Sequence, residues 1–233
     1  MVEEVLLNGY KIYPFDSKDH FLDHLENGNF GNILVALNAE KLVKEDRELK
    51  VLVNNNIGYP DGIGAVWALK RKGHNSEKIP GAEFWLDIIQ RHYNDKTFYL
   101  VGGKPEVIEQ TVDRLKEEYR GIDIVGYCNG YMDSQEQEKL IEDINTKEPD
   151  IVFVAMGSPK QEFVMEKMKR KHPALYMGLG GSFDIYSGRK ERAPKILRKM
   201  GLEWSYRLFK EPRRIFRQTS LITFFYKLVT NKL

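Results

Sequence analysis

A repeated order of apolar and charged segments constrains the fold of this chain more than any other feature. Residues 97–103 (TFYLVGG) and 151–157 (IVFVAMG) are apolar runs that end on glycine, which is typical of strands covered on both faces. Each is followed by a segment such as 159–171 (PKQEFVMEKMKRK), in which apolar residues recur at helical spacing. This order predicts an α/β fold with a mostly parallel sheet and helices on both faces.

The chain of 233 residues is long enough for one large domain with an appendage. We expect a core over residues 1–200 and an appendage over residues 201–233. The appendage is predicted to form two helical pieces interrupted around Pro212, because proline cannot donate the helical hydrogen bond. It carries seven lysines and arginines against two glutamates, although the whole chain has a net charge of only +2. The expected appendage is therefore helical, basic and amphipathic.

The residue types present exclude several classes of protein. Cys128 is the single cysteine, which excludes an internal disulfide and a multi-cysteine metal site. No run approaches the ~20 apolar residues of a membrane-spanning helix, and the first residues do not form a secretory signal, so we expect a cytoplasmic protein. Neither a G-x-G-x-x-G fingerprint after the first strand nor a Walker A loop is present. Because H-E-x-x-H and D-x-D patterns are also absent, we predict no bound metal and no other cofactor.

The first candidate for chemistry is Asp61, which lies between Pro60 and Gly62 just before the helix-like stretch 65–73 (AVWALKRKG). A carboxylate at such a turn has two interpretations. Asp61 either caps the following helix, a role worth about 1 kcal/mol, or acts as a general base with an oxygen free for a hydroxyl proton. The local sequence by itself favours the cap.

Two further segments are candidates for binding phosphate. Residues 156–162 (MGSPKQE) follow a buried strand and begin a helix, whose unpaired N–H groups attract anions. Residues 178–184 (GLGGSFD) also follow a strand, and their glycines permit close approach of a ligand to the backbone. The alternatives are an ordinary helix start with solvated polar residues and a simple turn.

Three arginines of the appendage, Arg207, Arg214 and Arg217, fall near one helical face. Guanidinium groups that converge on one place suit a pyrophosphate, because each can bind oxyanions through two hydrogen bonds. The alternatives are a solvated face or attraction to anionic lipid.

Taken in order, four segments resemble the motifs of glycosyltransferase family 26, the N-acetylmannosaminyl and N-acetylmannosaminuronyl transferases also labelled WecG/TagA/CpsF. They are residues 60–64 (PDGIG), 156–162, 178–194 (GLGGSFDIYSGRKERAP) and 201–218 (GLEWSYRLFKEPRRIFRQ). The resemblance implies a Rossmann-like core. It also implies transfer of a UDP-activated sugar to polyprenyl-diphosphate-linked N-acetylglucosamine, for teichoic acid linkage units, enterobacterial common antigen or capsule.

The resemblance assigns roles to residues. It implies that Asp61 is the catalytic base and that Arg207, Arg214 and Arg217 take part in catalysis. Because no metal is expected, we predict that these arginines hold the charge of the leaving UDP. Residues expected to bind substrate are Asn38, Gly62, Lys78, Gly157, Lys160, Gln161, Gly180, Gly181, Asp184 and Arg192.

The chain departs from the family pattern at two places. Ala36 replaces the threonine of a T-x-N motif that ends on Asn38, and Lys78 and Glu83 stand where an arginine and an aspartate are common. Lysine is a point charge that cannot replace the two-pronged guanidinium donor. These exchanges bear on which sugar the protein accepts.

We therefore expect an inverting, metal-independent transfer of N-acetylmannosamine from its UDP derivative to the lipid-linked acceptor in teichoic acid synthesis. The alternatives are transfer of N-acetylmannosaminuronate or a hexose for capsule or surface antigen, and a non-catalytic nucleotide-sugar-binding subunit. Peripheral association with the inner face of the cell membrane is expected through the apolar side of the appendage, with Phe224, Phe225 and Leu228. Self-association into a homo-oligomer is an alternative use of this apolar side, and no nucleic-acid partner is expected.

Overall fold

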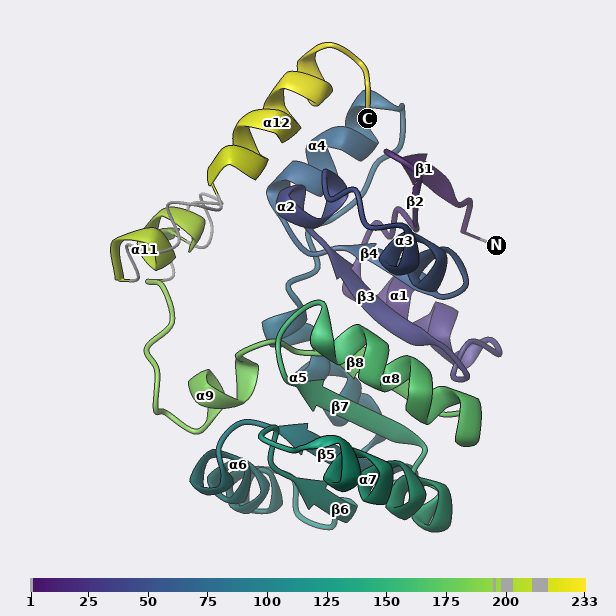
Figure 1. The fold of residues 1–233 in the computed structure, drawn as a ribbon, viewed down its shortest axis with the longest axis vertical. Helices are drawn as coiled ribbons and strands as arrows, with labels where there is room; N and C mark the ends of the chain where they lie inside the picture. The colour runs from purple at the N-terminus through teal and green to yellow at the C-terminus, as the bar shows by residue number, and fades with distance from the viewer. Residues whose placement is uncertain (1, 195, 198–202, 211–217) are drawn as a thin grey trace.

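The computed structural model describes residues 2–194, 196–197, 203–210 and 218–233 (Figure 1). Its centre is a six-stranded sheet with the strand order β4-β3-β8-β7-β5-β6, in which every neighbouring pair is parallel. The strands are β3 (Ile33–Leu37), β4 (Ile57–Pro60), β5 (Thr97–Gly102), β6 (Asp123–Cys128), β7 (Ile151–Ala155) and β8 (Leu175–Gly178).

Helices cover both faces of the sheet. One face is packed against α2 (Ala39–Leu42), α3 (Arg47–Asn54), α4 (Ile63–Arg71), α7 (Ser134–Lys147), α8 (Lys160–Lys171) and α12 (Gln218–Val229). The other is packed against α1 (Lys18–Glu26), α5 (Gly81–His92), α6 (Pro105–Glu118) and α9 (Ser182–Tyr186). The antiparallel hairpin of β1 (Val5–Leu7) and β2 (Tyr10–Ile12) adds to the first layer, and α11 (Glu203–Lys210) precedes α12.

The apolar runs of the sequence are explained by this two-sided burial. In β7, Val152 and Val154 belong to the core on one face, whereas Ile151 and Phe153 belong to the core on the other. Because successive side chains of a strand point to opposite faces, a strand with both faces covered needs apolar residues throughout. The predicted α/β fold, with a parallel sheet and helices on both faces, is confirmed.

Residues 39–54 form two helices and not one. The short helix α2 ends at Leu42, and α3 begins at Arg47. The side chain of Asp46 accepts a hydrogen bond from the Leu49 N–H and caps α3. A capping aspartate inside an otherwise helical pattern marks this boundary.

The direction in which the chain adds strands reverses between the neighbouring strands β5 and β7. After β5 the chain runs outward to β6, whereas after β7 it runs in the opposite direction to β8. Ligands of open parallel sheets bind outside the carboxyl ends of strands at such a reversal. The loops that follow β3, β4, β7 and β8 all leave the sheet at the edge formed by these carboxyl ends, which we call the strand-end edge.

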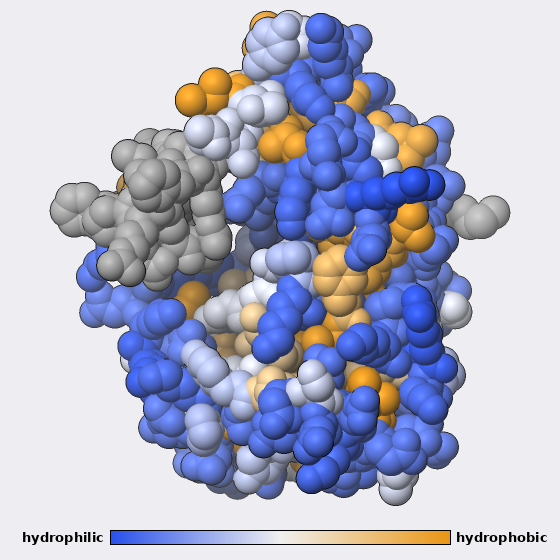
Figure 2. All heavy atoms as spheres, viewed as in Figure 1, coloured by the Kyte–Doolittle hydropathy of each residue, from blue (hydrophilic) through white to orange (hydrophobic). Residues whose placement is uncertain are grey.

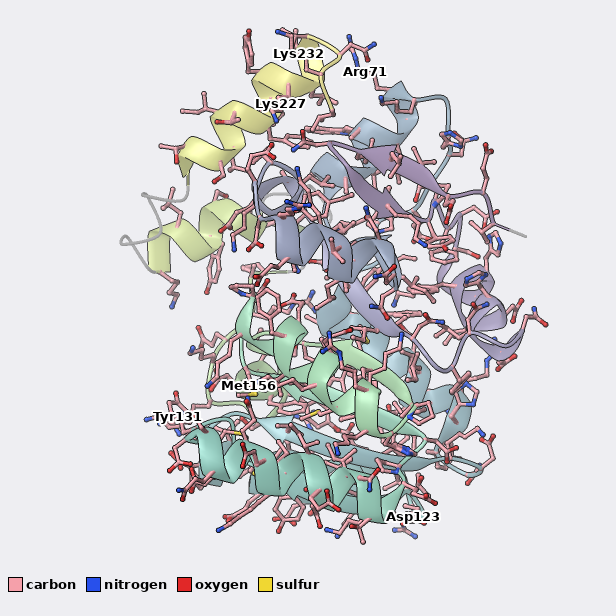
Figure 3. All side chains as sticks on the ribbon, turned by 45° about the vertical axis from the view of Figure 1, so that its right-hand side comes forward. Arg71, Asp123, Tyr131, Met156, Lys227 and Lys232 are labelled. Atoms are coloured by element: carbon pink, nitrogen blue, oxygen red, sulfur yellow. The ribbon has the colours of Figure 1, made fainter. Side chains whose placement is uncertain are left out.

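Helix α12 packs along α2 and α4, as Figure 1 shows. Phe224 is fully buried, with its ring against Gly64, and Leu228 is half-buried against the same core. The Lys227 Nζ donates to Asn8 Oδ1 at 2.9 Å (Figure 3). The expectation that Phe224 meets a membrane is therefore wrong. Helix α12 is apolar on more than one side, and the side that carries Phe224 packs against the core.

Two helices lie in the predicted appendage, while Pro212, at the expected interruption, lies outside the described residues. In the part of the chain that the structure describes, no helix is both long and apolar enough to cross a membrane.

Candidate active site

Asp61 follows β4 and is held between two backbone segments. Its N–H donates to the Leu37 carbonyl at 3.1 Å, and its Oδ1 accepts a hydrogen bond of 2.7 Å from the N–H of Gly81, the first residue of α5. The N-cap of the following helix α4 is Gly62, which makes no side-chain cap. The simple capping interpretation is therefore wrong: Asp61 satisfies an N-terminal N–H of α5 instead. The positive end of that helix favours an ionised carboxylate.

Tyr59 and Gly81 pack next to the Asp61 carboxylate. A Cβ atom on Gly81 would lie 2.7 Å from the Tyr59 hydroxyl and 3.7 Å from Asp61 Oδ1, so this position has no room for a side chain. The Tyr59 hydroxyl is buried without a hydrogen-bond partner among the described residues. Burial, followed by the charges of Asp61 and Glu162, raises the pKa of Tyr59 well above its ordinary value. Tyr59 is therefore a neutral packing group.

Asn38 lies beside Asp61 at the end of the neighbouring strand. It is the N-cap of α2, and its Oδ1 accepts a hydrogen bond of 3.0 Å from the Lys41 N–H. A Cβ on Gly62 would lie 3.5 Å from the Asn38 Cβ, which shows how close the two turns are. The structure thus brings Asn38, Asp61 and Gly62 together.

Gln161 joins the two glycine-containing loops. Its side-chain Oε1 accepts hydrogen bonds from the N–H of Gly157 at 3.1 Å and of Gly180 at 2.9 Å. The residue is only 5% exposed, and a Cβ on Gly178 would lie 2.4 Å from its Nε2. Gln161 therefore fixes the shape of the loops after β7 and β8.

The remaining residues of these loops are more accessible. Lys160 is the exposed first residue of α8, and Gly181 is the exposed N-cap of α9. The Asp184 Oδ2 lies 3.4 Å from the Lys190 Nζ, so these two side chains form an ion pair. In Figure 2, the surface recedes between α2 and the start of α8.

Arg192 connects the third motif to the Asp61 side of the site. Its Nη1 donates to Glu83 Oε1 at 2.8 Å, and its side chain is 15% exposed. Glu83 lies in the first turn of α5, close to Gly81, whose N–H holds Asp61. Lys78 is half-buried in the segment that runs beside β4, where the Ile79 N–H donates to the Pro60 carbonyl.

Three residues at this edge, Tyr59, Gly81 and Tyr131, could not be identified from the sequence. Gly81 lies within the segment 78–83, where Lys78 and Glu83 depart from the family pattern, and nothing in the sequence indicates Tyr59. Tyr131 lies in the loop after β6 and is 70% exposed; Figure 3 shows it on the same edge as Met156. An exposed aromatic residue following a strand is a weak signal by itself.

The predicted arginine clamp cannot be located. Arg207 belongs to α11, but its side chain lies outside the described residues, as do Arg214 and Arg217 entirely. Within the described ranges, no three histidine, cysteine, aspartate or glutamate side chains are arranged to hold a metal ion. The roles of the arginines and the absence of a metal stay predictions.

A doubly wound α/β domain with a fixed carboxylate and glycine loops at its strand ends is typical of enzymes that act on nucleotide-linked substrates. Residues 9–233 match the sequence model of the Glycosyl transferase WecG/TagA/CpsF family. The chain belongs to this family and is a glycosyltransferase, as the resemblance implied. A nucleotide-sugar donor, a glycan acceptor and a role in polysaccharide biosynthesis follow from the family.

The packing under Asp61 yields a prediction. Gly81→Ala should lower the free energy of unfolding by about 1–3 kcal/mol, because the new methyl overlaps the Tyr59 hydroxyl. Tyr59→Phe alone should be nearly neutral, since it removes an unpaired buried hydroxyl, and it should restore most of the loss when combined with Gly81→Ala. Urea unfolding of the four proteins measures this coupling. Equal losses with and without Tyr59→Phe would contradict the packing described.

Proposed function

We propose that this glycosyltransferase moves N-acetylmannosamine from UDP-N-acetylmannosamine to N-acetylglucosamine linked to a polyprenyl diphosphate, with inversion and without a metal. The observation that carries the proposal is the Asp61 carboxylate, which the N-terminus of α5 holds at the same strand-end edge as the glycine-containing loops after β7 and β8. A role in the teichoic acid linkage unit follows from this donor and acceptor.

In the proposed step, Asp61 takes the proton of the acceptor hydroxyl while that oxygen attacks the anomeric carbon. The bond from this carbon to the UDP oxygen breaks, and UDP leaves with the electron pair. Attack opposite the leaving group inverts the configuration. Asp61 acts as base, and the N–H of Gly81 keeps the carboxylate oriented throughout.

UDP is proposed to lie over the loops after β7 and β8. The N–H groups of Gly157 and Gly180 are already bonded to Gln161, so these loops contribute shape and close backbone approach. Lys160 supplies an exposed cation, and the Tyr131 ring offers a surface on which a base can stack.

The leaving UDP gains negative charge that must be stabilised. We assign this to Arg207, Arg214 and Arg217 of the appendage, acting as a clamp over the core. Residues 201–233 would then be a functional unit distinct from the core of residues 1–200, and the active site would be completed where the two meet.

One observation bears on the choice of donor. Arg192 is engaged by Glu83, so its positive charge is partly neutralised by a carboxylate within the site. A sugar that carries its own carboxylate would meet Glu83 as a like charge. This favours N-acetylmannosamine over N-acetylmannosaminuronate, which remains the second candidate.

We also propose that the enzyme binds the inner face of the cytoplasmic membrane, where the lipid-linked acceptor lies. The contact surface would consist of the exposed apolar side of α12 together with Trp67 of α4. The ring centroids of Trp67 and Phe225 lie 6.1 Å apart. Basic residues border this surface and suit anionic lipid. Its apolar members are Trp67, Ile222, Phe225, Tyr226 and Val229, and its basic neighbours are Lys70, Arg71, Lys72 and Lys232.

Replacing Asp61 tests the proposed base. Asp61→Asn keeps an acceptor for the Gly81 N–H, so folding and UDP affinity should be preserved while kcat falls about 10²- to 10⁴-fold. Calorimetric titration with UDP and a transfer assay measure the two effects. Asp46→Asn, at the capping aspartate of α3, is the control and should keep full activity. Retained turnover by Asp61→Asn would reduce Asp61 to a structural residue.

The membrane surface can be tested separately from catalysis. Ile222→Asp with Val229→Asp should weaken binding to phosphatidylglycerol vesicles more than tenfold, because each buried CH₂ contributes about 0.8 kcal/mol. Both side chains are at least 70% exposed, so the melting temperature should not change. Val51→Asp, on α3 and 55% exposed, is the matched control in vesicle sedimentation. Unchanged sedimentation together with a smaller particle in light scattering would instead identify a surface for self-association.

A further inference from the structure

Lys41 and Glu162 form a buried ion pair between the first turns of two helices. The Lys41 Nζ lies 2.7 Å from Glu162 Oε1, and the side chains are 10% and 1% exposed. Within the described ranges, Lys41 is the only buried lysine and Glu162 the only buried glutamate, and the two are paired with each other. Removing two charges from water is costly, and an apolar pair of similar volume is often as stable. Stability alone therefore does not account for the pair.

Glu162 carries a second cost. Its Oε2 is buried and has no hydrogen-bond partner among the described residues. A buried carboxylate oxygen without a donor is unfavourable. The fold thus keeps a charged residue where an apolar one would be easier to bury, which points to a role in the geometry of the neighbouring site.

Each partner lies next to a residue of the candidate active site. The Lys41 N–H donates to the side chain of Asn38, which begins α2 beside Asp61. Glu162 follows Gln161 in α8, and the Gln161 side chain holds the loops after β7 and β8.

The pair also crosses the strand-end edge. In the sheet, β8 lies between β3 and β7, while α2 follows β3 and α8 follows β7. The bond from Lys41 to Glu162 therefore spans the end of β8. It joins the half of the edge that holds Asp61 to the half that holds the proposed donor loops.

We propose that Lys41 and Glu162 are a positioning pair that fixes the separation of these two halves, and hence the distance from Asp61 to the donor sugar. The proposal rests on the proposed function, in which the reacting groups come from both halves. A charge-assisted hydrogen bond sets a distance and a direction, which an apolar contact does not. A displacement of about 1 Å in a reacting geometry can cost 100-fold in rate.

The double variant Lys41→Met with Glu162→Leu tests this directly. It removes both charges together, so neither is left buried without a partner. We expect a melting temperature close to that of the wild type, but kcat lower by about 10- to 100-fold. The hydrogen exchange of the Lys41, Gly157 and Gly180 N–H groups should be faster, because these amides belong to the two joined halves.

A more accessible ion pair on the same helix provides the control. Arg170 and Glu166 of α8 are 75% and 29% exposed, and their replacement by Met and Leu should leave kcat and the exchange of the three amides unchanged. If Lys41→Met with Glu162→Leu fails to fold, Glu162→Gln is the second variant, because it keeps the volume and an acceptor for Lys41. We expect it to lower kcat and the protection of the three amides in the same direction, with a decrease in kcat smaller than the about 10-fold predicted for loss of the pair.

Wild-type kcat and wild-type amide exchange in a folded variant without the charged pair would overturn the proposal. A wild-type enzyme that transfers no sugar would refute the proposed function instead. In that case the exchange of the three amides still decides whether the pair fixes the two halves.

Discussion

The parallel arrangement of the strands is the constraint on which this site depends. Because all six strands run in the same direction and both faces are covered, polar groups that bind substrate are confined to the edges of the sheet. The turns after β3, β4, β7 and β8 leave at one such edge. Asn38, Asp61, Gln161 and Gly180 are distant in sequence, yet their neighbourhood follows from this single arrangement.

The same edge concentrates polar groups that are costly to bury. Glu162 and Lys41 are paired inside the fold, Tyr59 has an unpaired hydroxyl, and Gln161 uses its carbonyl to hold two loops. The rest of the described core is mostly apolar, although Asn56, His92 and Thr111 are also buried there. Buried polar groups that lower stability are typical of functional sites, where geometry matters more than stability. It agrees with membership of a glycosyltransferase family, because transfer requires the donor and acceptor to be held at a fixed separation.

The fold could be predicted from the sequence, since apolar runs and helical periodicity report burial on two faces. The partners of the site residues could not. The bond from Asp61 to Gly81 spans 20 residues and exists only because the segment before α5 runs beside β4. The pair of Arg192 and Glu83 spans 109 residues. The burial of Phe224 could not be predicted either, because α12 is apolar on two sides and the sequence does not indicate which side packs against the core.

We propose that Asp61 and the loops after β7 and β8 form a transferase site that needs no metal. The most direct measurement is transfer from UDP-N-acetylmannosamine to a lipid-diphosphate-N-acetylglucosamine analogue in the presence of EDTA, compared with UDP-N-acetylmannosaminuronate and UDP-glucose. We expect an inverted disaccharide product from the first donor at a rate that EDTA does not change. Turnover that requires a divalent cation, or that occurs only with another donor, would contradict this proposal.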